Sequence, residues 1–462
     1  MAKAAGRTSG GTRAVTLRCS ECGWQTTKWV GRCGECQAWG TVAEPAGTPG
    51  RTTEAGPVTE PARRIHEVDA ELTQARPTGV DELDRVLGGG IVPGAVVLLA
   101  GEPGVGKSTL LLEVAACYAS PTTPTLYVTG EESAGQVRMR AGRTSALDPH
   151  LYLAAETDLG AVLGHIDAVQ PALLVVDSVQ TIASADVDGS AGGVTQVREV
   201  AASLIRVAKT RGLPTILVGH VTKDGSIAGP RLLEHLVDVV LSFEGDRHST
   251  LRMVRATKNR FGPADEVGCF ELDDSGIRGL ADPSGLFLSS ALSSTVPGSC
   301  VTVTLEGRRP LAAELQALVV PSHSGSPRRA TGGLDGSRVA LLLAVLQQRC
   351  GLPLSNAEVY VSTVGGVRTT EPAVDLAAAL ALASAATNRP VRGGLVAVGE
   401  VGLAGEVRRV PSIARRLSEA ARLGFTHALV PPDPGPLPEG IRVRTVATLD
   451  DALRAARISG PQ

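Results

Sequence analysis

A glycine-rich segment at residues 101–109, GEPGVGKST, constrains the fold of this chain more than any other stretch. It follows the apolar run VVLLA (96–100) and precedes the helical run LLLEVAACYA, which is the strand–loop–helix context of a phosphate-binding loop. Glycines let backbone N–H groups close around a phosphate at a helix N-terminus, where the helix dipole favours an anion. The predicted nucleotide-binding residues are Gly101, Glu102, Pro103, Gly104, Val105, Gly106, Lys107, Ser108 and Thr109. Lys107 is expected to neutralise the β- and γ-phosphate oxygens of ATP, and Ser108 to bind Mg²⁺.

More apolar runs of strand length alternate with helical segments as far as about residue 278. They are TLYVT (125–129), LLVVD (173–177) and TILVG (215–219), and residues 195–212 form an amphipathic helical pattern that ends at Gly212. Such runs, separated by helices, are typical of a parallel sheet that is buried on both faces. The sequence therefore predicts one α/β domain over residues 70–278.

Polar residues follow the ends of these predicted strands. Asp177 ends LLVVD, at the edge of the sheet where ligands bind in α/β proteins, and we predict that it holds Mg²⁺ together with Ser108. Glu131 and Glu132 follow TLYVT, and either could activate the attacking water, although a glutamate there could also simply complement a helix dipole. We assign the catalytic role to Glu131. His220, after TILVG, could sense the γ-phosphate, but a lone histidine at a strand end is more often structural.

Four of the eight cysteines form two CxxC pairs separated by ten residues, within a predicted module at residues 1–42. Four thiolates complete a tetrahedral zinc site with no open position, so the zinc is expected to be structural. A pair of redox dithiols is the alternative. The predicted zinc ligands are Cys19, Cys22, Cys33 and Cys36.

All three tryptophans of the chain also lie in this module, and we expect them to supply the core that so short a unit lacks. They are Trp24, Trp29 and Trp39. Residues 43–69 are rich in proline and glycine and are predicted to be a flexible linker.

The net charge of −2 over 462 residues excludes a globally basic nucleic-acid coat, and only 12 aromatic residues are present. Positive charge is local. Residues 1–64 contain nine Lys or Arg against five Glu, and two further basic strings lie at Lys258–Arg260 and Arg328–Arg329. A contact with nucleic acid would then depend on phosphates rather than on stacked bases. The chain has neither a secretory h-region nor a membrane-length apolar run, so we expect a cytoplasmic protein without a membrane partner.

Together these segments resemble the RadA (Sms) family of bacterial DNA-repair ATPases in the RecA superfamily. The similarity is carried by CSECGWQTTKWVGRCGECQAWGT, GEPGVGKSTLLLE, YVTGEES, LLVVDSVQT and the intact pentapeptide KNRFG (258–262). It implies an α/β fold class: a RecA-like P-loop NTPase core with an N-terminal zinc ribbon. The resemblance also implies that Lys258 and Arg260 of KNRFG couple hydrolysis to DNA. The candidate DNA contacts are Lys223, Arg231, Lys258, Arg260, Arg328 and Arg329.

Residues 279–462 mix strand and helix patterns and resemble the α+β domain of Lon protease. Within them the sequence predicts a polar, glycine-rich loop over residues 321–338, a helix over 375–387 and a hairpin over 396–407. Lon uses a serine nucleophile that a lysine activates. The matching positions here are Ala373, in EPAVD, and Ala414, in VPSIARR, so no peptidase activity is expected.

The resemblance implies a DNA-dependent ATPase of recombination and repair that promotes branch migration on single-stranded DNA. It implies a homo-oligomer, a hexameric ring, with RecA recombinase as a partner, ATP as substrate, and Zn²⁺ and Mg²⁺ as cofactors. Two alternatives stay open: an ATP-dependent Lon-like peptidase, and a non-enzymatic zinc adaptor that binds protein through Trp29 and Trp39.

Overall fold

The computed structural model describes residues 17–43, 62, 64–67, 74–220, 232–245, 250–286, 288, 296–322, 327–366 and 368–457. The chain forms two compact units, Met1–Asp69 and Ala70–Gln462. Within these described segments, no helix is both long and apolar enough to cross a bilayer.

The smaller unit contains a three-stranded antiparallel sheet in the order β2-β1-β3. The strands are β1 (Leu17–Cys19), β2 (Gln25–Thr26) and β3 (Val42–Ala43), and a 3-10 turn spans Ile65–Glu67. Its small core includes Cys19 and Cys33, with Trp24 packed against them. The expectation that all three tryptophans build this core is wrong, because Trp29 and Trp39 are each 74% exposed.

The larger unit begins with a nine-stranded sheet in the order β12-β11-β10-β9-β4-β8-β7-β5-β6. The four strands that the apolar runs predict are β4 (Val96–Gly101), β5 (Thr125–Thr129), β7 (Leu173–Asp177) and β8 (Thr215–His220), and all are parallel. The other strands are β6 (Leu151–Ala155), β9 (Val239–Gly245), β10 (Leu251–Asn259), β11 (Val267–Asp273) and β12 (Gly276–Gly279). β10, β11 and β12 extend the sheet in antiparallel pairing beyond β9.

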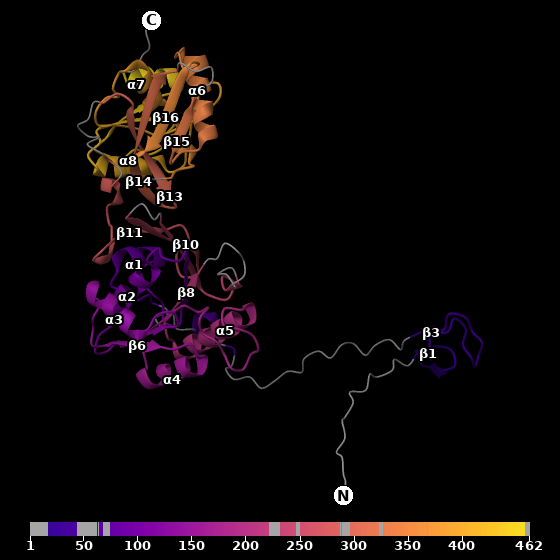
Figure 1. Cartoon of the computed structure of the whole chain (residues 1–462). Coiled ribbons are helices and arrows are strands. Elements are labelled where there is room, and N and C mark those ends of the chain that lie inside the picture. The colour runs from indigo at the N-terminus through magenta and orange to yellow at the C-terminus, as the bar shows by residue number, and fades with distance from the viewer. Residues whose placement is uncertain are drawn as a thin grey trace. The chain divides into compact units, whose positions relative to one another are not determined.

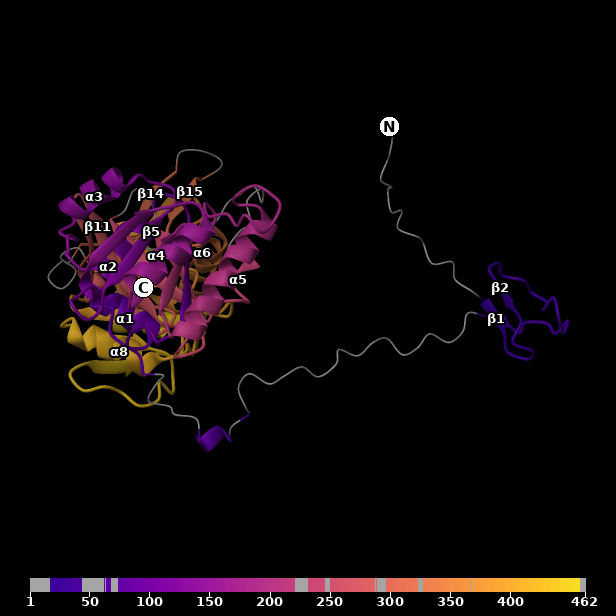
Figure 2. The same cartoon turned by 90° about the horizontal axis from the view of Figure 1, so that it is seen from below.

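Helices cover both faces of this sheet, which explains why its central strands are apolar throughout. Val97 and Leu99 pack with α1 (Asp81–Leu87), α2 (Lys107–Tyr118) and α3 (Ala134–Arg143). Val96 and Leu98 pack on the opposite face with α4 (Leu159–Val169) and α5 (Val194–Arg211). In Figure 2, α2 and α3 lie on one side of the core strands and α5 lies on the other.

The C-terminal part contains a seven-stranded mixed sheet in the order β15-β16-β14-β13-β17-β20-β21. Its strands are β13 (Ser299–Glu306), β14 (Arg309–Pro321), β15 (Arg329–Gly332), β16 (Ala357–Thr363), β17 (Leu395–Ala397), β20 (His427–Val430) and β21 (Arg442–Thr445). Its helices are α6 (Gly336–Cys350), α7 (Asp375–Thr387), α8 (Ile413–Arg422) and α9 (Leu449–Ala455). Both helices α6 and α7 pack into one core, and α8 belongs to a second core that includes β13 and β20.

Two local predictions for this part are wrong. Residues 329–332, predicted to lie in a loop, form β15, because parallel hydrogen bonds with β16 outweigh their polar composition. Residues 396–407, predicted to be one hairpin, are divided: β17 joins the main sheet, and β18 (Glu400–Val401) and β19 (Val407–Arg408) form a short separate hairpin.

The β13–β14 hairpin joins the C-terminal part to the nine-stranded sheet (Figure 1). At its tip, Arg309 is buried and forms an ion pair with the buried Glu82 of α1. The same guanidinium donates to the carbonyl oxygens of Val267, Leu280 and Ala281 at 3.2, 3.0 and 2.8 Å. Glu82 also accepts from the backbone N–H of Cys269 at 2.8 Å. The buried Arg309–Glu82 ion pair, with these additional hydrogen bonds, therefore holds the β13–β14 hairpin against the nine-stranded sheet.

Arg309→Met is expected to lower the free energy of unfolding of the larger unit by about 3–5 kcal/mol, because the buried Glu82 loses its buried cation and keeps only the half-exposed Arg85. Arg308→Ala is the matched control: Arg308 is 42% exposed beside Asp265 and Glu266, and its loss should cost at most about 1 kcal/mol. Urea denaturation of both variants measures the difference. Equal stability of the two variants would contradict the role of Arg309.

Candidate functional site

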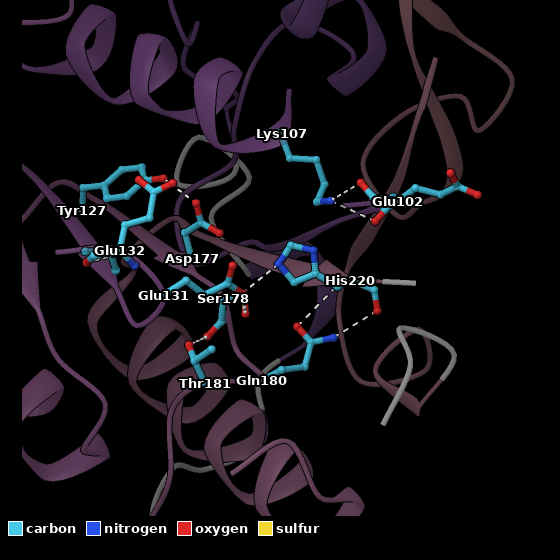
Figure 3. Close-up of polar contacts among 12 residues, drawn as sticks. Glu102, Lys107, Tyr127, Glu131, Glu132, Asp177, Ser178, Gln180, Thr181 and His220 are labelled. Carbon is cyan, nitrogen blue, oxygen red and sulfur yellow. Dashed lines mark hydrogen bonds and ion pairs between the residues drawn. The ribbon is translucent and has the colours of Figure 1, made fainter. Parts of the chain in front are cut away.

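The glycine-rich segment is a tight loop between β4 and α2. Gly106 precedes the first residue of α2 with a φ of 112°, a conformation that favours glycine. A Cβ on Gly101 would lie 2.5 Å from the carbonyl oxygen of Phe243, so β9 leaves no room for a side chain there. Lys107 Nζ donates to the carbonyl oxygens of Gly101 and Glu102 at 2.9 and 2.8 Å (Figure 3). Two carbonyl groups of the loop thus bind the loop's own lysine.

Burial and nearby negative charge have opposite effects on the pKa of Lys107. Its residue is only 3% exposed, and burial lowers the pKa of the ammonium group to about 8. The charges of Asp177 and Glu131 act in the opposite direction on that pKa. The structure therefore brings together three predicted catalytic residues from the loop, from β7 and from the segment after β5.

The two carboxylate oxygens of Asp177, the last residue of β7, differ in their hydrogen bonds. Its Oδ2 accepts from the hydroxyl of Tyr127 at 2.7 Å, whereas Oδ1 is buried and has no hydrogen-bond partner among the residues that the structure describes. Burial and the neighbouring Asp177 carboxylate raise the pKa of Tyr127 well above its usual value. A hydrogen bond with Ser108 acts in the opposite direction and lowers that pKa. Ser108 and Asp177 thus both interact with the Tyr127 hydroxyl, and the unpartnered Oδ1 of Asp177 fits a hard cation such as Mg²⁺.

Glu131 and Glu132 occupy different environments. Glu131 Oε1 accepts from Ser178 Oγ at 2.6 Å and lies 2.9 Å from His220 Nε2 (Figure 3). The hydrogen bond from His220, assisted by that from Ser178, lowers the pKa of Glu131 to about 2 against the effect of burial. Glu132 instead forms an ion pair with Arg140 of α3. Of the two glutamates, Glu131 is the one beside Lys107.

Sequence reasoning missed Arg252, a buried residue of β10. Its Nε donates to the carbonyl oxygen of Val105 in the phosphate loop at 2.8 Å. A Cβ on Gly245 would lie 2.3 Å from Arg252 Cδ, so this glycine leaves the space for the arginine. An arginine at a buried position of a β-strand was the available signal, since buried charge requires a partner.

Lys258 and Arg260 lie away from the phosphate loop of their own chain. Lys258 pairs with Val240 at the start of β9, whereas Gly101 pairs with Phe243 near the end of that strand. Lys258 Nζ donates to the carbonyl oxygens of Glu234 and Val237 at 2.8 and 2.7 Å. Burial, followed by the charge of Arg260, lowers the pKa of Lys258.

Arg260 is 56% exposed and lies 3.3 Å from Asp238. Arg328 and Arg329 are exposed at the start of β15. The other two candidate DNA contacts, Lys223 and Arg231, lie outside the described residues.

The four predicted zinc ligands meet in the smaller unit, where all four Sγ atoms lie within 4.8 Å of one another. The Sγ atoms of Cys19 and Cys36 are 3.8 Å apart, and those of Cys22 and Cys33 are 3.5 Å apart. A tetrahedral zinc site with bonds of about 2.3 Å has sulfur–sulfur edges of about 3.8 Å, so the geometry fits Zn²⁺. A hydrogen bond with Thr41 is the main cause that lowers the pKa of Cys19 to about 6.

The Lon-like positions carry no nucleophile and no base. Ala373 is fully buried in a 3-10 turn, and Ala414 is half-buried on α8. Beside them, the fully buried Arg416 forms an ion pair with Glu371 and donates to the carbonyl oxygen of Val303 at 2.7 Å. A buried ion pair thus lies next to the position that corresponds to the nucleophile.

Three family models match this chain. An AAA domain matches residues 59–226, a rubredoxin metal binding domain matches residues 18–44, and subunit ChlI of Mg-chelatase matches residues 343–434. These ranges correspond to the nucleotide-binding core, the four-cysteine module and the C-terminal part.

Full-length relatives are similar over nearly the whole chain. The DNA repair protein RadA of Mycolicibacterium smegmatis is 56% identical over 458 residues, which cover 96% of this chain and 98% of that protein. The protein of the same name from Mycobacterium tuberculosis H37Rv is 56% identical, with coverages of 95% and 92%. That of Streptococcus pyogenes serotype M1 is 46% identical, with coverages of 96% and 99%. These relatives and the family models confirm the predicted fold class: a RecA-like α/β core, an N-terminal zinc ribbon and a Lon-like C-terminal domain.

A solved structure of the RadB recombinase covers 44% of this chain and 98% of its own, with 23% identity and a TM-score of 0.36. That likeness is too weak to add to the assignment of the fold.

Cys19→Ser is expected to reduce the zinc content from one ion per chain to nearly none, because three thiolates hold the metal less tightly than four. All three tryptophans lie in this module, so their fluorescence should change in the variant and on adding a chelator, while ATP binding stays intact. Cys117→Ser, which lies outside the cluster, is the control. Retention of one zinc ion by the Cys19 variant would contradict the site.

Proposed function

Because this chain belongs to the RadA family of DNA repair proteins, we propose that it is an ATP-driven motor on single-stranded DNA. It promotes branch migration of recombination intermediates. The match to an AAA domain supports ATP hydrolysis by the core. The observation that carries the proposal is the meeting of Lys107, Asp177 and Glu131 at one edge of the parallel sheet.

Binding of ATP in this proposal uses the phosphate loop. Lys107 leaves the carbonyl oxygens of Gly101 and Glu102 and donates to the β- and γ-phosphate oxygens, which replace those acceptors. Ser108 and Asp177 would hold Mg²⁺, which neutralises phosphate charge when bound. Tyr127 keeps Asp177 oriented through the hydrogen bond to Oδ2, so Oδ1 is the oxygen that is available to a cation.

Glu131 accepts a proton from the attacking water in this proposal. Its carboxylate is ionised at neutral pH, and it lies near enough to Lys107 for their charges to affect each other's pKa. Glu132 is paired with Arg140, which removes it from the same role.

The exposed guanidinium of Arg260 and the neighbouring Lys258 lie at the sheet edge opposite the phosphate loop. From there they reach a phosphate of DNA or of a nucleotide bound by an adjacent subunit, which requires a homo-oligomer, and we propose a hexameric ring. Arg328 and Arg329 add exposed positive charge in the C-terminal domain. Lys223 and Arg231 complete the proposed DNA contacts.

The zinc ribbon has an accessory role in this proposal. The exposed Trp29 and Trp39 both lie near Gly31, and Arg32 stacks 5.7 Å above the ring of Trp39. Exposed tryptophans with an adjacent arginine are typical of protein-binding surfaces, and RecA recombinase is the proposed partner.

Lys107→Ala is expected to reduce ATP hydrolysis by more than about 100-fold with or without single-stranded DNA, because it removes the cation that faces the phosphates. Steady-state phosphate release measures the rate, and zinc content with circular dichroism shows that the variant is folded. Lys28→Ala, an exposed lysine of the zinc ribbon, should keep the wild-type rate. Full activity of the Lys107 variant would disprove the assignment.

A further inference from the structure

A cavity of about 310 Å³ lies between α2, α3 and β6 of the larger unit (Figure 1). Its walls are apolar and are formed by Leu112 of α2, Val137 of α3 and Leu153 of β6, among others. Leu147, between α3 and β6, also lines the cavity and is 51% exposed. Pockets that bind ligands begin at about 300 Å³, so this cavity has the size to accept one bulky apolar group.

Strand β6 forms an edge of the nine-stranded sheet. Within the described residues it pairs with β5 alone. The carbonyl oxygen of His150 and the N–H of Glu156 bond to residues of the β5 strand, so the alternation along the strand turns the backbone groups of Leu153 away from β5. An unpaired strand edge can bind an extended peptide, and alternate side chains of that peptide then lie on the same side of the sheet as the cavity.

The mouth of the cavity carries positive charge. Arg138 lines it, and Arg143 is exposed on the same helix. Neither arginine forms an ion pair within the part of the chain that the structure describes, whereas Arg140 of that helix does. Asp148 also lines the cavity, but it accepts a hydrogen bond from a backbone N–H at 2.8 Å. Charge complementarity therefore favours an acidic ligand over a basic one.

The inner wall of the cavity reaches the proposed metal site. Tyr127, which is 1% exposed, lines the cavity, and its hydroxyl donates to Asp177 Oδ2 at 2.7 Å (Figure 3). A group that fills the cavity therefore contacts the ring that orients the carboxylate proposed to hold Mg²⁺. One side chain thus connects the cavity with the nucleotide site.

We propose that this cavity binds an acidic peptide segment of a partner protein. The segment pairs with β6, places one bulky apolar side chain in the cavity and directs its carboxylates at Arg138 and Arg143. Through Tyr127, binding changes the Mg²⁺ concentration that ATP hydrolysis requires. The binding step is independent of the proposed function, whereas this effect on hydrolysis rests on it.

Binding is tested by the fluorescence anisotropy of a fluorescein-labelled peptide, Asp-Asp-Phe-Asp-Asp, titrated with the full chain in the absence of nucleotide and DNA. Replacing the phenylalanine by serine, or the four aspartates by lysine, should weaken binding at least about tenfold. Each change removes one of the two features that the cavity recognises, the apolar group or the negative charge.

Two variants at exposed positions test the site itself. Arg138→Glu reverses the charge at the mouth and Leu147→Asp adds a carboxylate to the apolar wall, so each should weaken binding at least about tenfold. The matched controls are Arg206→Glu, at an exposed arginine of α5, and Leu403→Asp, at a leucine that is 67% exposed in the C-terminal domain. Both controls should keep the wild-type affinity, and circular dichroism shows whether all four variants are folded.

The connection to the metal site has its own readout. A saturating concentration of the peptide should shift the half-maximal Mg²⁺ concentration for ATP hydrolysis by about fivefold, at the lower end for coupled sites. Tyr127→Phe keeps the ring and should keep peptide binding, but it should lose the shift because the hydrogen bond to Asp177 is gone.

Equal affinity for the acidic and basic peptides, or for the wild type and Arg138→Glu, overturns the proposal. So does a peptide affinity that falls as the protein concentration rises, because a second copy of the chain then occupies the cavity. A Mg²⁺ shift that persists in Tyr127→Phe disproves the connection through Tyr127. A wild type that binds the peptide and does not hydrolyse ATP overturns the proposed function instead, and leaves the peptide site in place.

Discussion

The burial of the Lys107 cation at the carboxyl edge of the sheet is the constraint on which the nucleotide site depends. A buried ammonium without partners would cost several kcal/mol, and here the loop carbonyls and the carboxylates of Asp177 and Glu131 reduce that cost. The loop must therefore stay closed, and Arg252 helps by fixing the carbonyl of Val105. Phosphate oxygens can replace the carbonyls with a stronger, charge-assisted interaction. In the proposed function, binding of a nucleotide would thus replace the carbonyl acceptors of Lys107 by phosphate oxygens without exposing the lysine.

Strand β10 connects three regions that the proposed function uses. Arg252 contacts the phosphate loop, Arg255 forms an ion pair with Glu306 of the C-terminal hairpin at 2.6 Å, and Lys258 lies at the opposite edge of the sheet. Six residues of strand span about 20 Å. Strand β9 pairs with β10 as far as Asn259, with an irregularity between Ala256 and Lys258, whereas β11 pairs with β10 only as far as Arg255.

The sequence predicts α7 and four of the parallel strands, β4, β5, β7 and β8, to within one residue, because each is an apolar run whose burial outweighs other preferences. It also identifies every charged residue that meets Lys107. It does not predict the parallel strands β6 and β9. The sequence does not reveal partners that depend on three-dimensional pairing: β15 forms only because β16 lies beside it, and Arg252 and Ser178 gain their roles from residues 147 and 47 positions away. The sequence also gives no physical reason to prefer Glu131 over Glu132, because their environments differ only in which residue, His220 or Arg140, faces each carboxylate.

The C-terminal domain differs from the Lon protease domain by more than Ala373 and Ala414, the alanines at the positions of the serine and the lysine. Glu371 directly precedes the turn that holds Ala373, and its carboxylate accepts from Thr304, from the N–H of Leu305 and from Arg416. A serine–lysine dyad needs a nucleophile that substrate can reach and a lysine that can lose its proton. Here the adjoining space holds a fully buried arginine, which keeps its charge and is tied to the backbone at Val303 and Pro411. Removal of Glu371 would leave the fully buried charge of Arg416 without its anion at a cost of about 3–5 kcal/mol, so the pair supports this region structurally. Restoring the serine and the lysine alone would leave that support in place, and the new side chains would meet a packed ion pair instead of an open cleft.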